Sequence, residues 1–388
     1  MSDQHDSTLS LYVHVPFCSS RCGYCDFNTY TATELGSDVR RDSFHEVLAA
    51  EVRYAAQRLG SARQVSTVFV GGGTPTLLGS RGLNFVLDEI RASFGLAPGA
   101  EVTTEANPDS VDRQMLDELR DGGFTRMSFG MQSAAPRVLQ VLERTHTPGA
   151  SVQAATWAVE TGFAHVNLDL IYGTPGETDD DLKRSIEAAL SAGIDHLSAY
   201  ALIVEEGTAL SRRISRGELP APDDDVCADR YEILDSMLEA AGMPWYEVSN
   251  WARPGGECAH NIAYWRSQDW WGVGPGAHSH LRGDRWWNIK HPAPYAERIA
   301  AHESPEAGSE TLTHGELHVE EIMLGVRLAE GISTSLAPAG VIADLIARGL
   351  VEPTAAQAGR LQLTLAGRLL ADAVVRALLD SEDQQSIL

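Results

Sequence analysis

The stretch Cys18-Ser-Ser-Arg-Cys22-Gly-Tyr-Cys25 decides how the rest of the chain is interpreted. It holds three of the five cysteines, and the other two are Cys227 and Cys258. Thiolates at these spacings converge on one soft metal centre if the loop wraps around it. A structural zinc site has four protein ligands, and a closed four-iron cluster has four cysteines. Three thiolates therefore favour an iron–sulfur cluster with one open iron.

Two other interpretations of the cysteine loop stay open at this point. The cysteines could be clustered by accident in a reactive or structural loop. They could also bind zinc, with His14 as the fourth ligand. An odd number of cysteines, three of them at one end, does not indicate a disulfide framework. We therefore expect a reducing compartment, the cytoplasm.

Composition narrows the class of protein. A chain of 388 residues buries a large core and is expected to form one large and one smaller domain. Hydrophobic residues make up 43% and charged residues 22%, as in soluble globular proteins. The net charge of −24 excludes a surface that follows nucleic-acid phosphates. Neither a secretory signal nor an apolar run long enough to cross a bilayer is found.

Short apolar strands alternate with helical patterns through the first 200 residues. The expected strands are 11–15, 67–70, 101–105, 126–130, 166–171 and 196–202. The expected helices are 44–59, 111–120, 135–143, 152–161 and 180–192. About six such units predict an α/β fold with a parallel sheet whose chemistry lies at the strand C-termini. A partial (β/α)6 barrel and an open doubly wound sheet both fit this pattern.

The predicted domain boundaries follow changes in composition. Residues 1–10 are expected to be a flexible tail, 11–205 the partial barrel, and 206–301 a Trp-rich extension with a helix at 224–241. The polar stretch 302–309 is the candidate linker, and 310–388 forms the C-terminal domain. In that domain, helices at 315–329, 339–348 and 366–379 with a strand at 360–364 predict a mainly helical, winged-helix-like α+β unit. Residues 380–388 are expected to form a C-terminal tail without regular secondary structure.

A glycine-rich turn follows the second predicted strand. Its sequence is Gly71-Gly72-Gly73-Thr74-Pro75. Backbone without side chains lets a ligand approach closely, and its exposed N–H groups hold a carboxylate or a ribose. Alone, such a turn indicates only a tight loop. Its position directly after a strand makes it a candidate cofactor-binding segment.

Polar residues also recur near the ends of later strands. They are Glu105, Gln132, Arg144 and Asp169. Each alone could be a solvated loop residue or a helix cap. Because the C-terminal ends of parallel strands meet at one face, together they predict a binding site. Carboxylates there accept hydrogen bonds from ribose hydroxyls, and an arginine pairs with a carboxylate.

Seven of the eight tryptophans fall between Trp245 and Trp287, around His260-Asn-Ile-Ala-Tyr264-Trp265. A histidine among tryptophans is usually packed and hydrogen-bonded. Neutral imidazole is nevertheless a good haem-iron ligand, and flat aromatic side chains line porphyrins. His260 is the candidate haem residue, and His278 is the reserve candidate.

The cysteine spacing, with Tyr24 just before the last cysteine, resembles the signature of the radical S-adenosylmethionine (SAM) superfamily. The segments Tyr12-Val-His-Val-Pro-Phe17 and Asp26-Phe27-Asn28 resemble the branch of oxygen-independent coproporphyrinogen III oxidases and HemW-type haem chaperones. The resemblance implies a partial barrel and a [4Fe–4S] cluster on Cys18, Cys22 and Cys25, with SAM on the open iron. The SAM contacts that it implies are Tyr12, Tyr24, Gly72, Gly73, Thr74, Glu105, Gln132, Arg144, Asp169 and Ala201.

Two features separate the oxidases from the chaperones within this branch. The oxidases carry a further cysteine two residues after the last cluster ligand, where this chain has Phe27. They also carry a substantial extension before the motif, whereas 17 residues precede Cys18 here. The segment His260–Trp265 resembles a HemW motif associated with haem. The chaperone is therefore the first hypothesis.

The resemblance implies a haem chaperone whose partners are haem, a haem-accepting, respiratory protein and a reductant for the cluster. Contact with a membrane-bound acceptor is left open, and nucleic acid is not expected. The alternative is a radical SAM enzyme, either a coproporphyrinogen dehydrogenase or a methyltransferase. A zinc-binding interaction protein is the third hypothesis.

Overall fold

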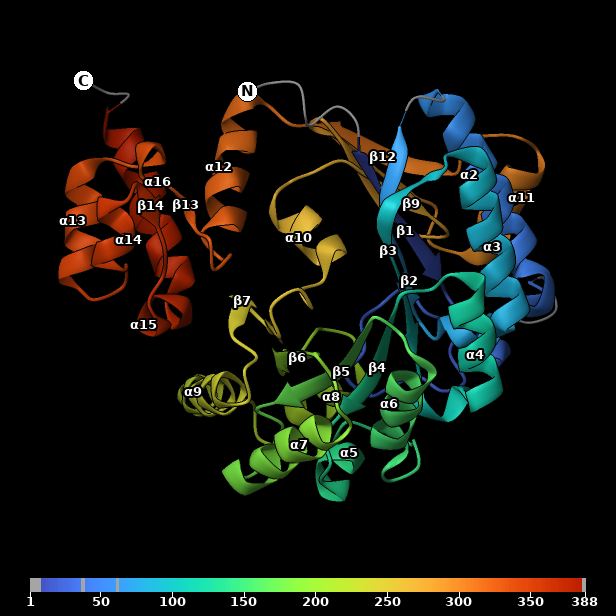
Figure 1. Ribbon diagram of the computed structural model, residues 1–388, viewed down its shortest axis with the longest axis horizontal. Helices are drawn as coiled ribbons and strands as arrows, with labels where there is room; N and C mark the ends of the chain where they lie inside the picture. Colours follow the sequence, from blue (N-terminus) through green and yellow to red (C-terminus); the bar gives the residue numbers. More distant parts are fainter. Residues whose placement is uncertain (1–7, 36–38, 61–62, 386–388) are drawn as a thin grey trace.

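Six consecutive parallel strands form the centre of the computed structural model, which describes residues 8–35, 39–60 and 63–385 (Figure 1). The strands are β1 (Thr8–Val15), β2 (Gln64–Gly72), β3 (Leu96–Ala106), β4 (Arg126–Gln132), β5 (His165–Tyr172) and β6 (His196–Ala201). Leu11, Val13 and Val15 of β1 are fully buried, as expected for a parallel strand covered on both faces.

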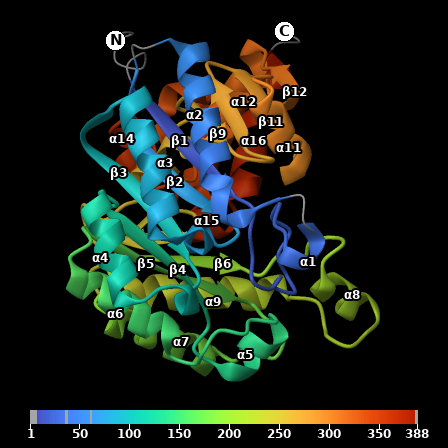
Figure 2. The ribbon, with the colours of Figure 1, turned by 90° about the vertical axis from the view of Figure 1, so that its right-hand side faces the viewer.

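Helices cover the outer face of this curved sheet (Figures 1 and 2). They are α2 (Phe44–Leu59), α3 (Gly79–Ser93), α4 (Arg113–Gly122), α5 (Pro136–Val141), α6 (Ala150–Thr161) and α7 (Asp179–Ser191). In α2, Phe44, Leu48, Val52 and Ala55 face the core at helical spacing. The predicted partial barrel is thus confirmed, whereas α3 was not among the predicted helices.

Both edges of the parallel sheet are extended by the Trp-rich region. At one edge, β9 (Trp270–Val273) pairs with β1 in parallel and is followed by β10 (His278–Leu281), β11 (Asp284–Asn288) and β12 (Glu306–Thr311). At the other edge lie β8 (Asn250–Ala252) and β7 (Trp245–Glu247). Trp251 and Trp271 are fully buried, so these tryptophans mainly close the core of the sheet.

Three predicted boundaries differ in the structure. Residues 306–309 of the expected linker and the first two residues of the expected C-terminal domain form strand β12, whose backbone pairs with β11. Residues 8–10 of the expected tail belong to β1, and residues 1–7 lie outside the described part of the chain. Helix α16 continues to Gln385, so 380–385 is helical, and residues 386–388 are outside the description.

The C-terminal region has a hydrophobic core of its own, which includes Ile322, Leu345, Leu361 and Val374. Its elements are α12 (His314–Gly325), β13 (Ile332–Ser333), α13 (Ala339–Ala347), α14 (Pro353–Gln357), β14 (Arg360–Leu361), α15 (Leu365–Leu369) and α16 (Ala371–Gln385). The predicted terminal helix is two helices that separate at Leu370.

The remaining helices connect the sheet to its extensions. They are α1 (Ala32–Leu35), α8 (Ala209–Ser215), α9 (Asp224–Ala240), α10 (Ala259–Trp265) and α11 (Pro292–Ala300). Among the described residues, no helix is both long enough and apolar enough to span a bilayer.

Candidate cluster and cofactor site

The cysteine loop leaves β1 at Pro16 and packs against the glycine-rich turn after β2. The amide of Gly73 donates to the carbonyl of Val15 at 2.8 Å, and that of Thr74 donates to Phe17 at 2.7 Å. A Cβ atom on Gly73 would lie 2.4 Å from the carbonyl oxygen of Phe17. Glycine is therefore required at position 73 for the two loops to meet.

One cavity of about 150 Å³ contains all three cysteines and most of the predicted SAM contacts. The cavity is lined by Cys18, Cys22 and Cys25 together with Tyr24, Gly72, Gly73, Thr74, Glu105, Gln132, Arg144 and Asp169. Segments from five different β–α units thus come together at the C-terminal ends of the strands, where chemistry is expected in such a barrel.

Two predicted SAM contacts lie outside this cavity. Tyr12 is in the barrel wall, where its hydroxyl is 3.0 Å from Nδ1 of His14. Ala201, at the end of β6, lines a separate cavity on the side of the C-terminal domain.

The cysteine environment suits an iron–sulfur cluster. Burial, with smaller contributions from the neighbouring Cys25 and Cys22, raises the pKa of Cys18 to about 11, so the bound metal must favour the thiolate. Burial likewise raises the pKa of Cys25. Arg144 donates a hydrogen bond from Nη1 to Sγ of Cys22 at 3.4 Å. Three soft sulfur ligands beside a guanidinium fit a cluster whose negative charge the protein must offset.

His14 is not placed to complete a zinc site. Its Nε2 donates to the carbonyl of Asn28 at 2.9 Å, and its Nδ1 accepts from Tyr12. Burial lowers the pKa of His14, so the ring is neutral with both nitrogens engaged. Among the described residues, no three His, Cys, Asp or Glu side chains are grouped as ligands of a single metal ion.

Two carboxyl groups, each only partly exposed, line the same cavity as the cysteines. Burial and the nearby Asp169 raise the pKa of Glu105 to about 8, although Glu105 accepts from the amide of Gly72 at 3.0 Å. Burial also raises the pKa of Asp169, which accepts from Nδ2 of Asn167 at 2.7 Å. Desolvated carboxyl groups of this kind are suited to ligand hydroxyls.

The sequence analysis missed polar residues of the barrel interior. Ser128 and Asn167 lie beside Asp169, and both line a second cavity of about 340 Å³ inside the barrel. Asn167 precedes Asp169 by two residues, so strand periodicity could have placed both on one face. We name this space the barrel cavity, and we name the cavity that contains the three cysteines the cluster cavity. Glu105 and Asp169 line both cavities, and the barrel cavity extends to Asn261 of α10.

His260, which was predicted to bind haem, is fully buried in α10. Its Nδ1 is 2.8 Å from Oγ1 of Thr67, and its Nε2 is 2.9 Å from the hydroxyl of Tyr264. Burial lowers the pKa of His260 to about 3, so the ring is neutral. In contrast, Asn261, Tyr264 and Trp265 line a cavity of about 380 Å³, named here the motif cavity.

The reserve candidate His278 is exposed at the start of β10, where its ring stacks on Trp287 with centroids 5.8 Å apart. The structure thus places His278 on the outer extension of the sheet, whereas α10 lies beside the barrel interior.

A buried ion pair fixes the start of α10. Glu101 of β3 accepts hydrogen bonds from the amides of Ala259 and His260 at 3.1 and 3.0 Å. Arg126 of β4 pairs with Glu101 at 3.0 Å and donates to the carbonyls of Gly256 and Glu257, each at 2.9 Å. The barrel strands therefore hold the helix that carries the His-Asn-Ile-Ala-Tyr-Trp segment.

The sequence of this chain matches the radical SAM superfamily and proteins of one family within it. The model of the radical SAM superfamily matches residues 12–189. The haem chaperone HemW of Mycobacterium tuberculosis H37Rv is 56% identical over 96% of this chain and 95% of its own length. The chain belongs to the HemW family. The HemW of Bacillus subtilis is 33% identical over 95% of this chain and 99% of its own length.

A solved structure extends the comparison of the fold beyond the HemW family. The coproporphyrinogen III oxidase HemN of Escherichia coli superposes with a TM-score of 0.82 at 24% identity. The match covers 97% of this chain and 91% of HemN, so the two share the barrel and the C-terminal region.

Proposed function

We propose that this HemW-family protein is a cytoplasmic haem chaperone that binds haem, a [4Fe–4S] cluster and SAM, and passes haem to an acceptor protein. The main support is the single cavity that gathers three cysteines and eight of the ten predicted SAM contacts. The curated relatives of the same length are named haem chaperones. The acceptor is proposed to be a respiratory protein, and a separate reductant would serve the cluster.

In this proposal each cavity residue has a defined role. Cys18, Cys22 and Cys25 hold the cluster, and Arg144 offsets its charge and that of the SAM carboxylate. The turn Gly72–Thr74 approaches the amino-acid end of SAM. Glu105 and Asp169 accept hydrogen bonds from its ribose. When bound, the cluster and SAM together supply one-electron chemistry, or they arrange the protein for haem transfer.

The haem-linked residue in this proposal is His260, on the segment that contains Tyr264 and Trp265. Because Nε2 of His260 is hydrogen-bonded to Tyr264, ligation of haem iron requires that bond to break first. Otherwise His260 acts only through Tyr264, whose ring lines the motif cavity.

A radical SAM enzyme is the second candidate, since HemN has the same fold. Anaerobic reconstitution, followed by parallel titrations with haem and coproporphyrinogen III, separates the two. We expect stoichiometric haem uptake and no turnover. Formation of protoporphyrinogen IX would overturn the chaperone proposal.

The cluster itself is tested by Cys22→Ser, because a hydroxyl is a poor ligand for iron–sulfide. Iron and sulfide content should fall to background in this variant and stay unchanged in Cys227→Ser. Zinc in place of iron in the wild-type protein would contradict both the proposed cluster and the proposed binding of SAM to it.

A further inference from the structure

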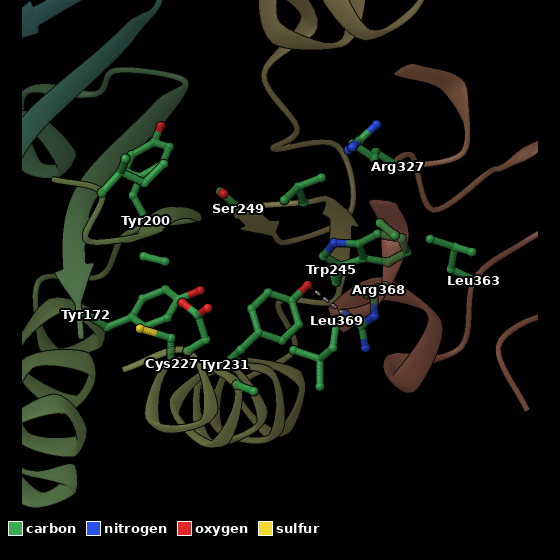
Figure 3. A pocket seen from close by; sticks show the side chains of 16 residues that line it. Tyr172, Tyr200, Cys227, Tyr231, Trp245, Ser249, Arg327, Leu363, Arg368 and Leu369 are labelled. Carbon is green, nitrogen blue, oxygen red and sulfur yellow. Dashed lines mark hydrogen bonds between the residues drawn. The ribbon is translucent and has the colours of Figure 1, made fainter. Parts of the chain in front are cut away.

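A further large cavity lies between the barrel and the C-terminal region. This interface cavity has a volume of about 380 Å³, within the usual range of ligand pockets. Its barrel side comprises residues at the ends of β5 and β6, on α9 and near β7. Its other side comprises Arg327, Leu363, Arg368 and Leu369 of the C-terminal region (Figure 3).

Flat aromatic side chains line the interface cavity. Tyr172 and Tyr231 face it from the barrel side, and Trp245 lies opposite Tyr172 (Figure 3). The Arg368 guanidinium lies 4.5 Å from the centroid of Trp245 and makes two 2.7 Å hydrogen bonds to Asp235. A fixed cation thus orients the indole, and aromatic rings of this kind pack against other planar rings.

Two donors, Nε1 of Trp245 in β7 and the guanidinium of Arg327 in the C-terminal region, lie where the two sides of the cavity meet and are candidates for binding an anion. Nε1 of Trp245 is buried and has no hydrogen-bond partner among the described residues. Arg327 is mostly buried but pairs with Asp372, whose side chain is 77% exposed. Arg327 also donates to the carbonyl of Met323, but its carboxylate partner Asp372 is solvated, so a ligand carboxylate can take the place of Asp372. In a chain of net charge −24, these donors mark the end of the cavity suited to a carboxylate.

The acidic group of the cavity lies at its other end. Asp224 lines the cavity from the first turn of α9, on the barrel side, whereas Arg327 belongs to the C-terminal region. The cavity thus separates an acidic end from a basic end, with aromatic rings between them. A planar ligand with a carboxylate on one edge has one favourable orientation in such a site.

The interface cavity also adjoins the motif cavity. Tyr200, Val248 and Ser249 line both cavities. Tyr200 lines the barrel cavity as well, so one side chain separates three spaces. A ligand in the interface cavity would therefore lie next to the segment that contains Tyr264 and Trp265. His260 lines neither cavity, so it would act on such a ligand through Tyr264.

Resting on the proposed chaperone function, we propose that the interface cavity is the haem site. The macrocycle packs against Tyr231 and Trp245, and one propionate pairs with Arg327 and accepts a hydrogen bond from Nε1 of Trp245. Haem bound there touches both the barrel and the C-terminal region, so its release is governed by how firmly those two parts hold together.

The test uses the full-length, anaerobically reconstituted protein and follows the Soret band during titration with haem and with haem dimethyl ester. Arg327→Gln and Trp245→Phe each remove one donor, and Ala228→Trp fills the cavity from α9. Arg348→Gln is the control, since Arg348 lies in the same region in an exposed pair with Asp344.

We expect Arg327→Gln to weaken haem binding about 10-fold or more, as for a lost charged hydrogen bond. Wild type should prefer haem over its dimethyl ester, and Arg327→Gln should abolish that preference. Ala228→Trp should lower the affinity for both haem and its dimethyl ester, and Arg348→Gln should change neither affinity. Thermal unfolding of each variant identifies any that fails to fold.

The outcomes distinguish this inference from the proposed function. If wild type binds haem and Arg327→Gln, Trp245→Phe and Ala228→Trp bind it equally well, the interface cavity is not the haem site and the chaperone function stands. If wild type binds neither haem nor its ester, the proposed function itself fails.

Discussion

Arg144 donates a hydrogen bond to the sulfur of Cys22 and another to the carbonyl of Gly130, at 3.4 and 2.7 Å. The guanidinium is thus anchored to β4 while it contacts a predicted cluster ligand. Hydrogen bonds to cysteine sulfur help to set the reduction potential of an iron–sulfur cluster. In Arg144→Met we expect a lower potential, because the reduced, more negative cluster loses a cation.

An anaerobic redox titration monitored by electron paramagnetic resonance measures that potential. Arg113→Met is the control, because Arg113 forms an exposed pair with Glu160. Equal potentials in wild type and Arg144→Met would show that this contact does not tune the cluster.

His260 and Tyr264 form a matched pair for testing the haem-linked role. His260→Ala should cost about 3 kcal/mol of stability, because it leaves a cavity and unpaired hydroxyl groups. It should also weaken haem binding while iron and sulfide content stays unchanged. Tyr264→Phe removes the bond to Nε2 and should leave haem affinity equal or higher if His260 ligates iron. Equal haem affinity of His260→Ala and wild type would exclude His260 as the ligand.

Arg126 holds the start of α10 through Glu101 and two carbonyl groups. Arg126→Met leaves Glu101 buried without its cation and should destabilise the fold by about 3–5 kcal/mol. Arg266→Met, which breaks an exposed pair with Glu330, should cost less than about 1 kcal/mol. Urea unfolding of the three proteins compares these values. A cost for Arg126→Met as small as that of Arg266→Met would contradict the anchoring role.

Glu51 links α2 to the Trp-rich extension. It accepts hydrogen bonds from Gly274, Asn288 and Tyr295, yet burial raises its pKa from 4.5 to about 7. Between these two values the folded protein binds a proton that the unfolded chain has released. Stability should therefore fall as pH rises from about 4.5 to about 7.

Glu51→Gln should remove this part of the pH dependence, because glutamine does not titrate. The melting temperature of both proteins across that pH range provides the measurement. Parallel curves for wild type and Glu51→Gln would show that Glu51 does not cause the slope.

The central strands and most outer helices could be predicted because each has a local pattern. Helix α2 has the predicted bounds, and Leu83, Val86, Leu87 and Ile90 carry the same signal for the missed α3. The edge strands could not be predicted in this way. Strands β7 and β8 have three residues each, too few for a period, and their pairing depends on distant chain segments.

The functional residues likewise divide into those in local motifs, which could be predicted, and those brought together by packing of distant segments, which could not. Most of the predicted cluster and SAM residues lie in short motifs at strand ends, which the barrel topology brings together. The interface cavity depends on α9, β7 and the C-terminal region packing against one another. No local sequence pattern reports such packing, so Arg327 and Trp245 were not predicted.

The pairing of β9 with β1 has a consequence for biosynthesis. Residues Trp270–Val273 pair with Ser10–Val13, so β1 gains its second neighbour only after some 260 more residues have been made. Until then its edge is open to other chains. Nascent protein is accordingly most exposed to aggregation, and most dependent on chaperoning of its own, while the middle of the message is being translated.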